Sequence, residues 1–222
     1  MHYFNYAADL SLTDEPAFLE LMKDREEANK KGETLVAFTN RKLNGVKGCA
    51  LLKLWCDYYP SMSERFAAAD PKQRLQWVGP TMSVRSSITA RLMETWSHTQ
   101  AIYDLLGVER VEHDRIKNIV VMGVNTFGWT FINRKEEVPD DKPYLCLTAP
   151  SGEIWEWHDP SKSNFIEGSA VDFCRVVTQT RNIADTQLKV TGNTATRWMS
   201  FAQCFAGPPN DPPVPGSRYI QS

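Results

Sequence analysis

The sequence predicts an α+β protein in which helices come first and a smaller mixed unit of strands and helices follows. Up to residue 136, apolar residues recur at spacings of three and four, which is typical of helices. After the linker VPDDKP, short runs alternate between apolar and polar residues, which is typical of strands. We therefore divide the chain into a helical bundle at 1–136, a small α/β domain at 137–208 and a flexible, proline-rich tail at 209–222.

The first part of the chain contains several predicted helices. HYFNYAADLSL already has helical periodicity, and a second helix begins at the segment TDEP, where proline suits the first turn, and ends at Gly32. A short helix is expected at 33–41 and a longer one at 46–69, in which Pro60 should cause a kink or a break. The loop DPKQRLQWVGP leads to the next helix.

The longest predicted helix runs from Thr81 to Gly107. Ser83 is a suitable N-cap, and Gly107 can adopt the left-handed conformation that ends many helices. Spacings of three and four predict one buried stripe, formed by Ile88, Leu92, Trp96, Thr99, Tyr103 and Leu106. Much of the other side is also small or apolar, so we expect neighbours to cover more than one face, at Ala90, Ala101, Ile102 and Leu105.

The rest of the chain is expected to form one more helix and then the mixed unit. The helix covers 113–133, and strands are expected at 144–148, in EIWEWH and at 164–168. SAVDFCRVVTQTR predicts a helix capped by Ser169, LKVTG a short strand, and ATRWMSFAQCFAG the last helix.

Composition excludes some classes of function. The net charge is 25 − 27 = −2 and no segment is strongly basic, which argues against nucleic acid or an anionic membrane as the main partner. The chain has no apolar run near the ~18 residues of a membrane span and no signal-peptide pattern. Its five cysteines are scattered and never form a CxxC pair, so we expect reduced thiols and a cytoplasmic location.

Glu94 and His98 are the strongest candidates for a functional site. They are four residues apart, so they lie one turn apart on the same side of the helix and can both reach one divalent ion. The alternative is a surface pair that contributes roughly 0.2–0.5 kcal/mol. Arg91 precedes Glu94 by three residues, either as its partner or as a clamp for an anionic ligand. Zinc enzymes usually need three protein ligands, so two are not sufficient.

The chain resembles the metal-binding proteins related to mycothiol-dependent maleylpyruvate isomerase, within the DinB-like superfamily. The resemblance rests on LQWVGPTMS, TARLMETWSHTQAIYDLLGV, LTAPSGEIWEW, VDFCRVVTQTR, LKVTG and FAQCFAGPP. It implies a DinB-like up-and-down helical bundle followed by a small α/β domain similar to sterol-carrier proteins. In that family a histidine from an early helix holds the ion together with the Glu and His of an E-x-x-x-H motif, which correspond to Glu94 and His98.

The resemblance also has a departure at the start of the chain. Aligning HYFNYAADLSLTDEPAF with the early helix of the family puts the expected histidine just before Met1, so the bundle would be one helix short. His2 is the nearest substitute as third ligand, but two positions turn it roughly 200° around a helix. The alternative for His2 is a frayed terminal residue. A bundle short of one helix would leave apolar surface bare and favour a homo-oligomer.

The resemblance implies a reaction as well. Arg181 lies where the family has a basic residue after the helix of its second domain, and it would orient a carboxylate, with Arg91 in a similar role and Arg85 as a cofactor-binding residue. Alternatively, Arg181 is an ordinary charge at a helix C-terminus. The ion would be zinc, given nitrogen and oxygen donors, and it would bind a low-molecular-weight thiol as thiolate. The thiolate would isomerise or modify a small carboxylate substrate.

Two other readings remain open. The first is a non-catalytic or degenerate metal-binding or interaction protein of the same fold, which the missing histidine favours. The second comes from similarity of the last part of the chain to a region named for wyosine-base formation in tRNA-modifying proteins. The balanced charge argues against RNA binding.

Overall fold

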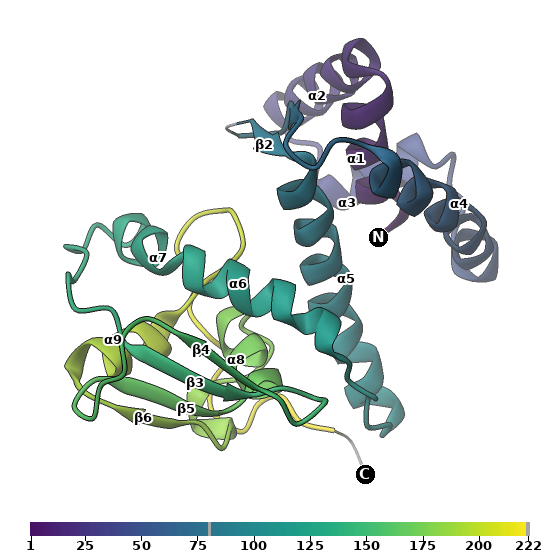
Figure 1. The fold of residues 1–222 in the computed structure, drawn as a ribbon. Coiled ribbons are helices and arrows are strands. Elements are labelled where there is room, and N and C mark those ends of the chain that lie inside the picture. Colours follow the sequence, from purple (N-terminus) through teal and green to yellow (C-terminus); the bar gives the residue numbers. More distant parts are fainter. Residues whose placement is uncertain (80, 221–222) are drawn as a thin grey trace. The chain divides into compact units, whose positions relative to one another are not determined.

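The computed structural model describes residues 1–79 and 81–220, which fold into two compact units, Met1–Arg91 and Leu92–Ser222 (Figure 1). The first unit consists mainly of helices, and the second combines helices with a four-stranded sheet. The α+β class with a helical N-terminal part is therefore confirmed. The longest helix, α5 (Val84–Leu106), begins in the first unit and ends in the second.

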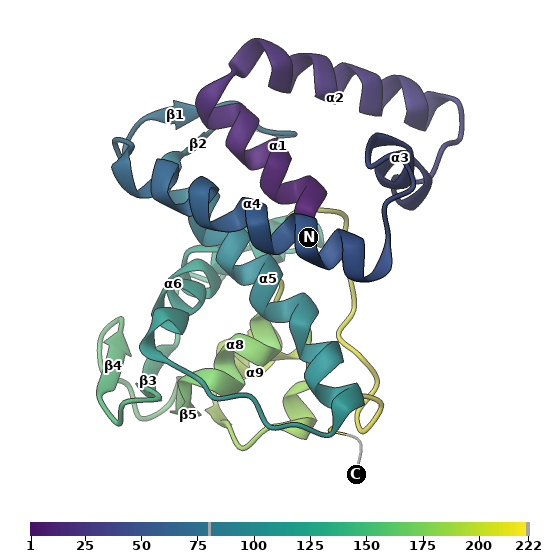
Figure 2. The same ribbon diagram turned by 90° about the vertical axis from the view of Figure 1, so that its right-hand side faces the viewer.

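The first unit is built on four helices, α1 (His2–Thr13), α2 (Glu15–Lys30), α3 (Leu35–Lys42) and α4 (Gly48–Ala68). Helix α1 packs against both α2 and α4 (Figure 2). The side chain of Asp14 accepts a hydrogen bond from the Ala17 amide and so caps α2 at the predicted position. Two apolar clusters fill the space between these helices, and Phe18 and Phe38 are fully buried in one of them.

Helix α4 does not break at Pro60, which lies inside it. The residues on both sides of the proline are held by the same buried carboxylate of α1. The Tyr58 hydroxyl donates to Oδ2 of Asp9, and Nε of Arg65 donates to Oδ1 at 2.8 Å. These bonds across α1 and α4 support the helix where proline removes a backbone donor.

A short hairpin that the sequence did not predict lies between α4 and α5. Strand β1 (Arg74–Leu75) pairs antiparallel with β2 (Met82–Ser83). Each strand has two residues, too few to show alternation. The burial of Leu75 in the core of the first unit and hydrogen bonds from the Arg74 side chain to Thr81 support their pairing.

Helix α5 begins and ends where the sequence predicted. Oγ of Ser83 accepts a hydrogen bond from the Ser86 amide, and Gly107 has a φ of +66°. The predicted burial is correct at Trp96 but wrong near the C-terminal end, where Leu106 is 67% exposed. Leu105 and Ile102 are also exposed, because the buried side of these last turns is polar and contains Gln100 and Asp104.

The second unit contains a mixed sheet with the strand order β4-β3-β5-β6. The strands are β3 (Tyr144–Thr148), β4 (Ile154–Trp157), β5 (Phe165–Ser169) and β6 (Lys189–Thr191). Strand β3 pairs antiparallel with β4 and parallel with β5, and β6 pairs antiparallel with β5. Alternate residues are buried on one face only: Leu145, Leu147, Trp155 and Ile166.

Helices cover the buried face of this sheet. They are α8 (Ala170–Val177), which Ser169 caps as predicted, and α9 (Asn193–Phe201), with α6 (Lys117–Asn125) and α7 (Phe127–Asn133) packed on them. The helix predicted at 113–133 is interrupted at Thr126 and preceded by the 3-10 turn η1 (Asp114–Ile116). A second 3-10 turn, η2 (Ile183–Asp185), precedes β6. The predicted domain division at 136 stays a prediction, although α6 and α7 share the core of the second unit.

Residues 209–220, which the sequence assigns to a flexible tail, are hydrogen-bonded along the second unit. Nδ2 of Asn210 donates to Oε1 of Gln179 at 2.7 Å, and the carbonyl of Pro213 accepts from Asn182 at 2.8 Å. The amide of Gly216 donates to Asp185 at 2.8 Å. These bonds bring the end of the chain back to the C-terminal end of α8.

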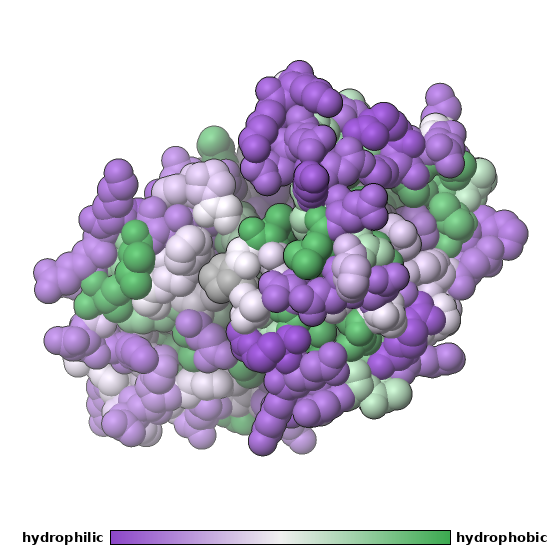
Figure 3. All heavy atoms as spheres, turned by 90° about the horizontal axis from the view of Figure 1, so that it is seen from above, coloured by the Kyte–Doolittle hydropathy of each residue, from purple (hydrophilic) through white to green (hydrophobic). Residues whose placement is uncertain are grey.

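The surface drawn in Figure 3 and the helices lack the long apolar segments that the sequence also lacks, over the residues that the structure describes. On the face drawn in Figure 3, hydrophilic side chains predominate and hydrophobic ones lie scattered among them. Over the described ranges, none of the helices is both long enough and apolar enough to cross a bilayer.

Candidate functional site

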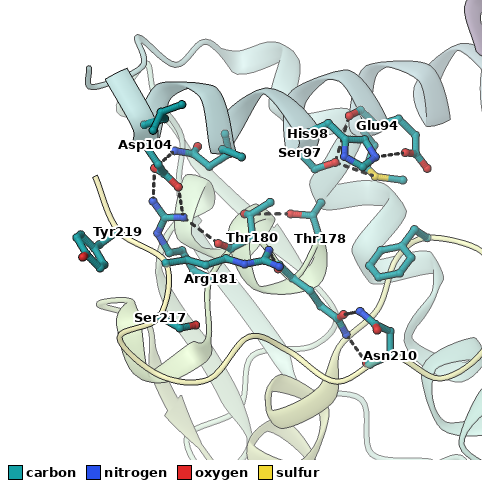
Figure 4. A pocket seen from close by; sticks show the side chains of 17 residues that line it. Glu94, Ser97, His98, Asp104, Thr178, Thr180, Arg181, Asn210, Ser217 and Tyr219 are labelled. Atoms are coloured by element: carbon teal, nitrogen blue, oxygen red, sulfur yellow. Dashed lines mark hydrogen bonds and ion pairs between the residues drawn. The ribbon is translucent and has the colours of Figure 1, made fainter. Parts of the chain in front are cut away.

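A cavity of about 760 Å³ opens in the second unit between α5 and the segment that follows α8 (Figure 4). Helix α5 contributes Met93, Glu94, Ser97, His98, Gln100, Ala101, Asp104 and Leu105. The other walls are formed by Thr178, Gln179, Thr180, Arg181, Phe205, Asn210, Ser217, Arg218 and Tyr219. Hydroxyl, amide and charged groups from three segments therefore face one space, which suits a small polar ligand.

Glu94 and His98 lie together on the α5 wall, as the sequence predicted. Nε2 of His98 is 3.2 Å from Oε2 of Glu94. The His98 side chain is 69% exposed and that of Glu94 is 31% exposed, so the pair is open to the cavity and to solvent. The apolar cover expected beside them is absent at Ala101 and Leu105, which are both exposed.

The distance between Nε2 of His98 and Oε2 of Glu94 is close to that between two ligands of a zinc ion. Two ligands of a tetrahedral ion at bond lengths of ~2.0–2.2 Å are about 3.3–3.6 Å apart. The observed 3.2 Å lies just below that range, and it also fits a hydrogen-bonded pair without a metal. Across 1–79 and 81–220, His, Cys, Asp and Glu do not gather in a group of three or more that could hold an ion. Glu94 and His98 therefore stand as a two-donor pair.

Arg181 lines the cavity but is already bound by a carboxylate. Its Nη1 and Nη2 donate to the two oxygens of Asp104 at 2.9 and 2.6 Å, and both side chains are buried. Burial alone would raise the pKa of Asp104, but hydrogen bonds from Arg181 and Gln100 and the charge of Arg181 outweigh it, so the pKa is lowered. Bidentate pairing uses the edge of the guanidinium that would otherwise bind a substrate carboxylate.

A chain of polar contacts extends from this ion pair along α5. Nε2 of Gln100 donates to Asp104 at 2.8 Å, and its Oε1 accepts from Arg110 at 3.0 Å. Arg110 binds Glu112 at 2.8 Å and stacks over the ring of Trp96 at 4.2 Å. The network explains why the buried side of the last turns of α5 is polar rather than apolar.

The buried thiols near the cavity do not supply a nucleophile. Cys174 and Cys204 are both buried, and burial raises the pKa of each thiol. The negative charge of Glu94 raises the pKa of Cys204 further, which indicates that this carboxylate lies near it. Both thiols stay protonated at neutral pH, so thiol chemistry in this cavity needs a thiol from outside the chain.

The remaining predicted site residues belong to the first unit. Arg91 is buried, with its guanidinium 5.5 and 5.8 Å from the ring centres of Phe4 and Trp77. Arg85 is exposed. His2 is not frayed: it is 9% exposed and its ring packs edge-on against Tyr58 at 5.0 Å. Its role as a third metal ligand, like the roles of Arg91 and Arg85, stays a prediction.

Sequence reasoning missed Asp104 and Arg218. Asp104 follows Gln100 by four residues, a spacing that often joins an amide and a carboxylate on one helix face, so a signal was present. Arg218 lies in the proline-rich tail, where no periodicity indicates which residues return to the fold. Only tertiary contacts place it at the cavity.

Comparison with known proteins gives two relatives and one family. The uncharacterized proteins MT0041 and Rv0036c of Mycobacterium tuberculosis (strains CDC 1551 / Oshkosh and ATCC 25618 / H37Rv) are each 38% identical over 199 residues. The match covers 90% of this chain and 76% of each relative. No solved structure matches the chain significantly.

The family described as mycothiol maleylpyruvate isomerase N-terminal domain matches residues 4–103, which include most of α1, all of α2 to α4 and most of α5 with Glu94 and His98. The resemblance seen in the sequence segments is thereby confirmed. Residues 4–103 of this chain therefore form a domain of that DinB-like family.

Proposed function

We propose that this protein binds a divalent ion through Glu94 and His98 and acts on a small carboxylate with the help of a low-molecular-weight thiol. The observation that carries the proposal is the 3.2 Å contact between the two donor atoms at the wall of a polar cavity. The family supports it, because its description names a mycothiol-related isomerase. Nitrogen and oxygen donors favour zinc.

Different residues of this chain would have different roles in binding the ion and the substrate. Glu94 and His98 would hold the ion, whose chemistry when bound is to lower the pKa of a coordinated thiol. Thr178 and Thr180 face the pair across the cavity (Figure 4). Their hydroxyls already donate to the backbone carbonyls of Cys174 and Arg175, so they would accept hydrogen bonds from the substrate. Since Cys174 and Cys204 stay protonated, the thiol must be a separate small molecule. The reaction would be an isomerisation or a thiol transfer.

We also propose a specific topology for each part of the fold. The helical part would be a DinB-like up-and-down bundle, and the small sheet with helices on one face would correspond to a sterol-carrier-like domain. The cytoplasm is the location we propose, on the basis of the unpaired cysteines.

Metal analysis of the purified protein tests the proposal. We expect Glu94→Ala and His98→Ala to weaken zinc binding by at least about a hundredfold, because even partners of metal ligands contribute about 10–100-fold. The matched controls are Glu109→Ala and His113→Ala, two exposed residues outside the cavity. Zinc content that is unchanged in both cavity variants would refute the proposal.

One observation favours a second function, a non-catalytic protein of the same fold. The guanidinium of Arg181, which the family resemblance assigns to the substrate, is held by Asp104. A thermal-shift titration with zinc separates the two functions. At one fixed zinc concentration, a non-catalytic remnant with two ligands binds weakly and should gain little stability. A complete site whose dissociation constant is a hundredfold below that concentration should gain about 2.7 kcal/mol.

A further inference from the structure

The cavity contains a second guanidinium that the sequence did not indicate. Arg218 lines it together with its neighbours Ser217 and Tyr219. In the described part of the chain, Arg218 makes no contact with a carboxylate; its Nη1 donates to the carbonyl of Gln179 at 2.9 Å. Arg181, by contrast, is bound to Asp104 through two nitrogens. Of these two cations, Arg218 is the one with an edge left for an anion.

The segment that carries Arg218 is held in place by specific bonds. Asn210 is tied to Gln179, and Gly216 to Asp185. The hydroxyl of Ser217 donates to the carbonyl of Val214 at 2.6 Å and closes a turn. Asn210 precedes the prolines of this segment and Gly216 follows them. Proline restricts the backbone of the unfolded chain, so fixing the segment costs little conformational entropy. The segment therefore delivers Arg218 to the cavity wall in a defined position.

The charges of the cavity also favour an anion near Arg218. The lining residues include two carboxylates, Glu94 and Asp104, and two guanidiniums, Arg181 and Arg218. Asp104 and Arg181 neutralise each other. A divalent ion at Glu94 would leave a net positive cavity, and Arg218 supplies the planar pair of donors that a carboxylate binds best.

We propose that Arg218, not Arg181, is the residue that binds the carboxylate of the substrate in this cavity. The inference deepens the proposed function and rests on it for the identity of the site as the substrate site. Arg181 then has a positioning role: it fixes Asp104 and the walls of the cavity.

Binding of succinate, measured by isothermal titration calorimetry, tests this inference. Wild-type protein should bind succinate and should not bind its neutral analogue succinamide. Arg218→Gln should weaken succinate binding by about tenfold or more, because a charged bidentate contact is lost. Arg218→Lys should retain part of the affinity, since the charge remains without the second donor. Arg115→Gln, an exposed arginine outside the cavity, should bind within about twofold of wild type.

The titrations are made on protein as purified and after treatment with EDTA, so that an ion cannot account for the carboxylate binding. Arg218→Gln should keep the zinc content of the wild type, whereas Glu94→Ala should lose zinc and still bind succinate in EDTA. Failure of the metal site and failure of the anion site are thus observed separately. Two results would overturn the inference: no succinate binding by the wild type, or equal binding by Arg218→Gln.

Discussion

At the scale of single residues, the buried pair of Asp104 and Arg181 makes the second unit sensitive to the loss of either side chain. The two side chains are mostly buried, so water can replace the lost partner only in part if one is removed. Replacing Asp104 by Ala should therefore lower the free energy of unfolding by about 3–5 kcal/mol. Urea unfolding measures the change. Asp159→Ala, at an exposed position, should stay within about 0.5 kcal/mol of wild type, and an equally small effect for Asp104→Ala would contradict the role of the pair.

The lowered pKa of Asp104 also predicts how stability depends on pH. The folded protein keeps this carboxylate charged at a pH where the unfolded chain has taken up the proton. The stabilisation is complete above the ordinary value of 3.8 and is lost as pH falls toward the lower folded pKa. Between about pH 5 and pH 3, Asp104→Asn should lose less stability than wild type. Equal slopes in urea midpoints measured over this range would exclude the ion pair as the cause.

At the scale of secondary-structure elements, the contact between α6 and α8 depends on a glycine. A Cβ atom at Gly123 would lie 2.9 Å from Phe173 and 3.0 Å from Val177, both buried on α8. Gly123→Ala should lower stability by about 1–3 kcal/mol through overpacking. Gly128 on α7 provides a matched control, because a Cβ there meets only Val138 at 3.7 Å. Gly128→Ala should stabilise by about 0.5–1 kcal/mol through helix propensity.

The two glycine variants should change the free energy of unfolding in opposite directions, and thermal or chemical unfolding measures both changes. Both remove backbone freedom from the unfolded chain, but only Gly123 leaves no space for a methyl group. If Gly123→Ala is as stable as Gly128→Ala, then α6 and α8 are not in close contact in solution.

At the scale of the whole molecule, each unit has its own core, so a local defect should stay within one unit. Asp9 joins α1 to α4 through Tyr58 and Arg65 in the first unit. Asp9→Ala should cost about 1–3 kcal/mol by leaving these donors without their acceptor. Hydrogen-exchange mass spectrometry should show faster exchange in α1 and α4 and unchanged exchange in β3 and β5. Faster exchange everywhere would mean that the chain unfolds as a single cooperative body.

The interior of α5 shows where sequence patterns stop being informative. Its ends were predicted from Ser83 and Gly107, because capping is a local property. Burial of Leu106 was predicted from spacing alone and is wrong, since spacing identifies an apolar stripe but not whether a neighbour covers it. Likewise, Pro60 predicts a break from local chemistry, and the bonds of Asp9 from another helix support the helix instead.

The sequence by itself determined the class of fold, the ends of most elements, the family, and the placing of Glu94 beside His98. All of these follow from contacts within a few residues along the chain or from recognisable segments. Only the tertiary structure decided that Arg181 is bound to Asp104 and that Arg218 faces the cavity. Asp104 and Arg181 are 77 positions apart, and Arg218 lies in the proline-rich segment after α9, so no local periodicity encodes either placement.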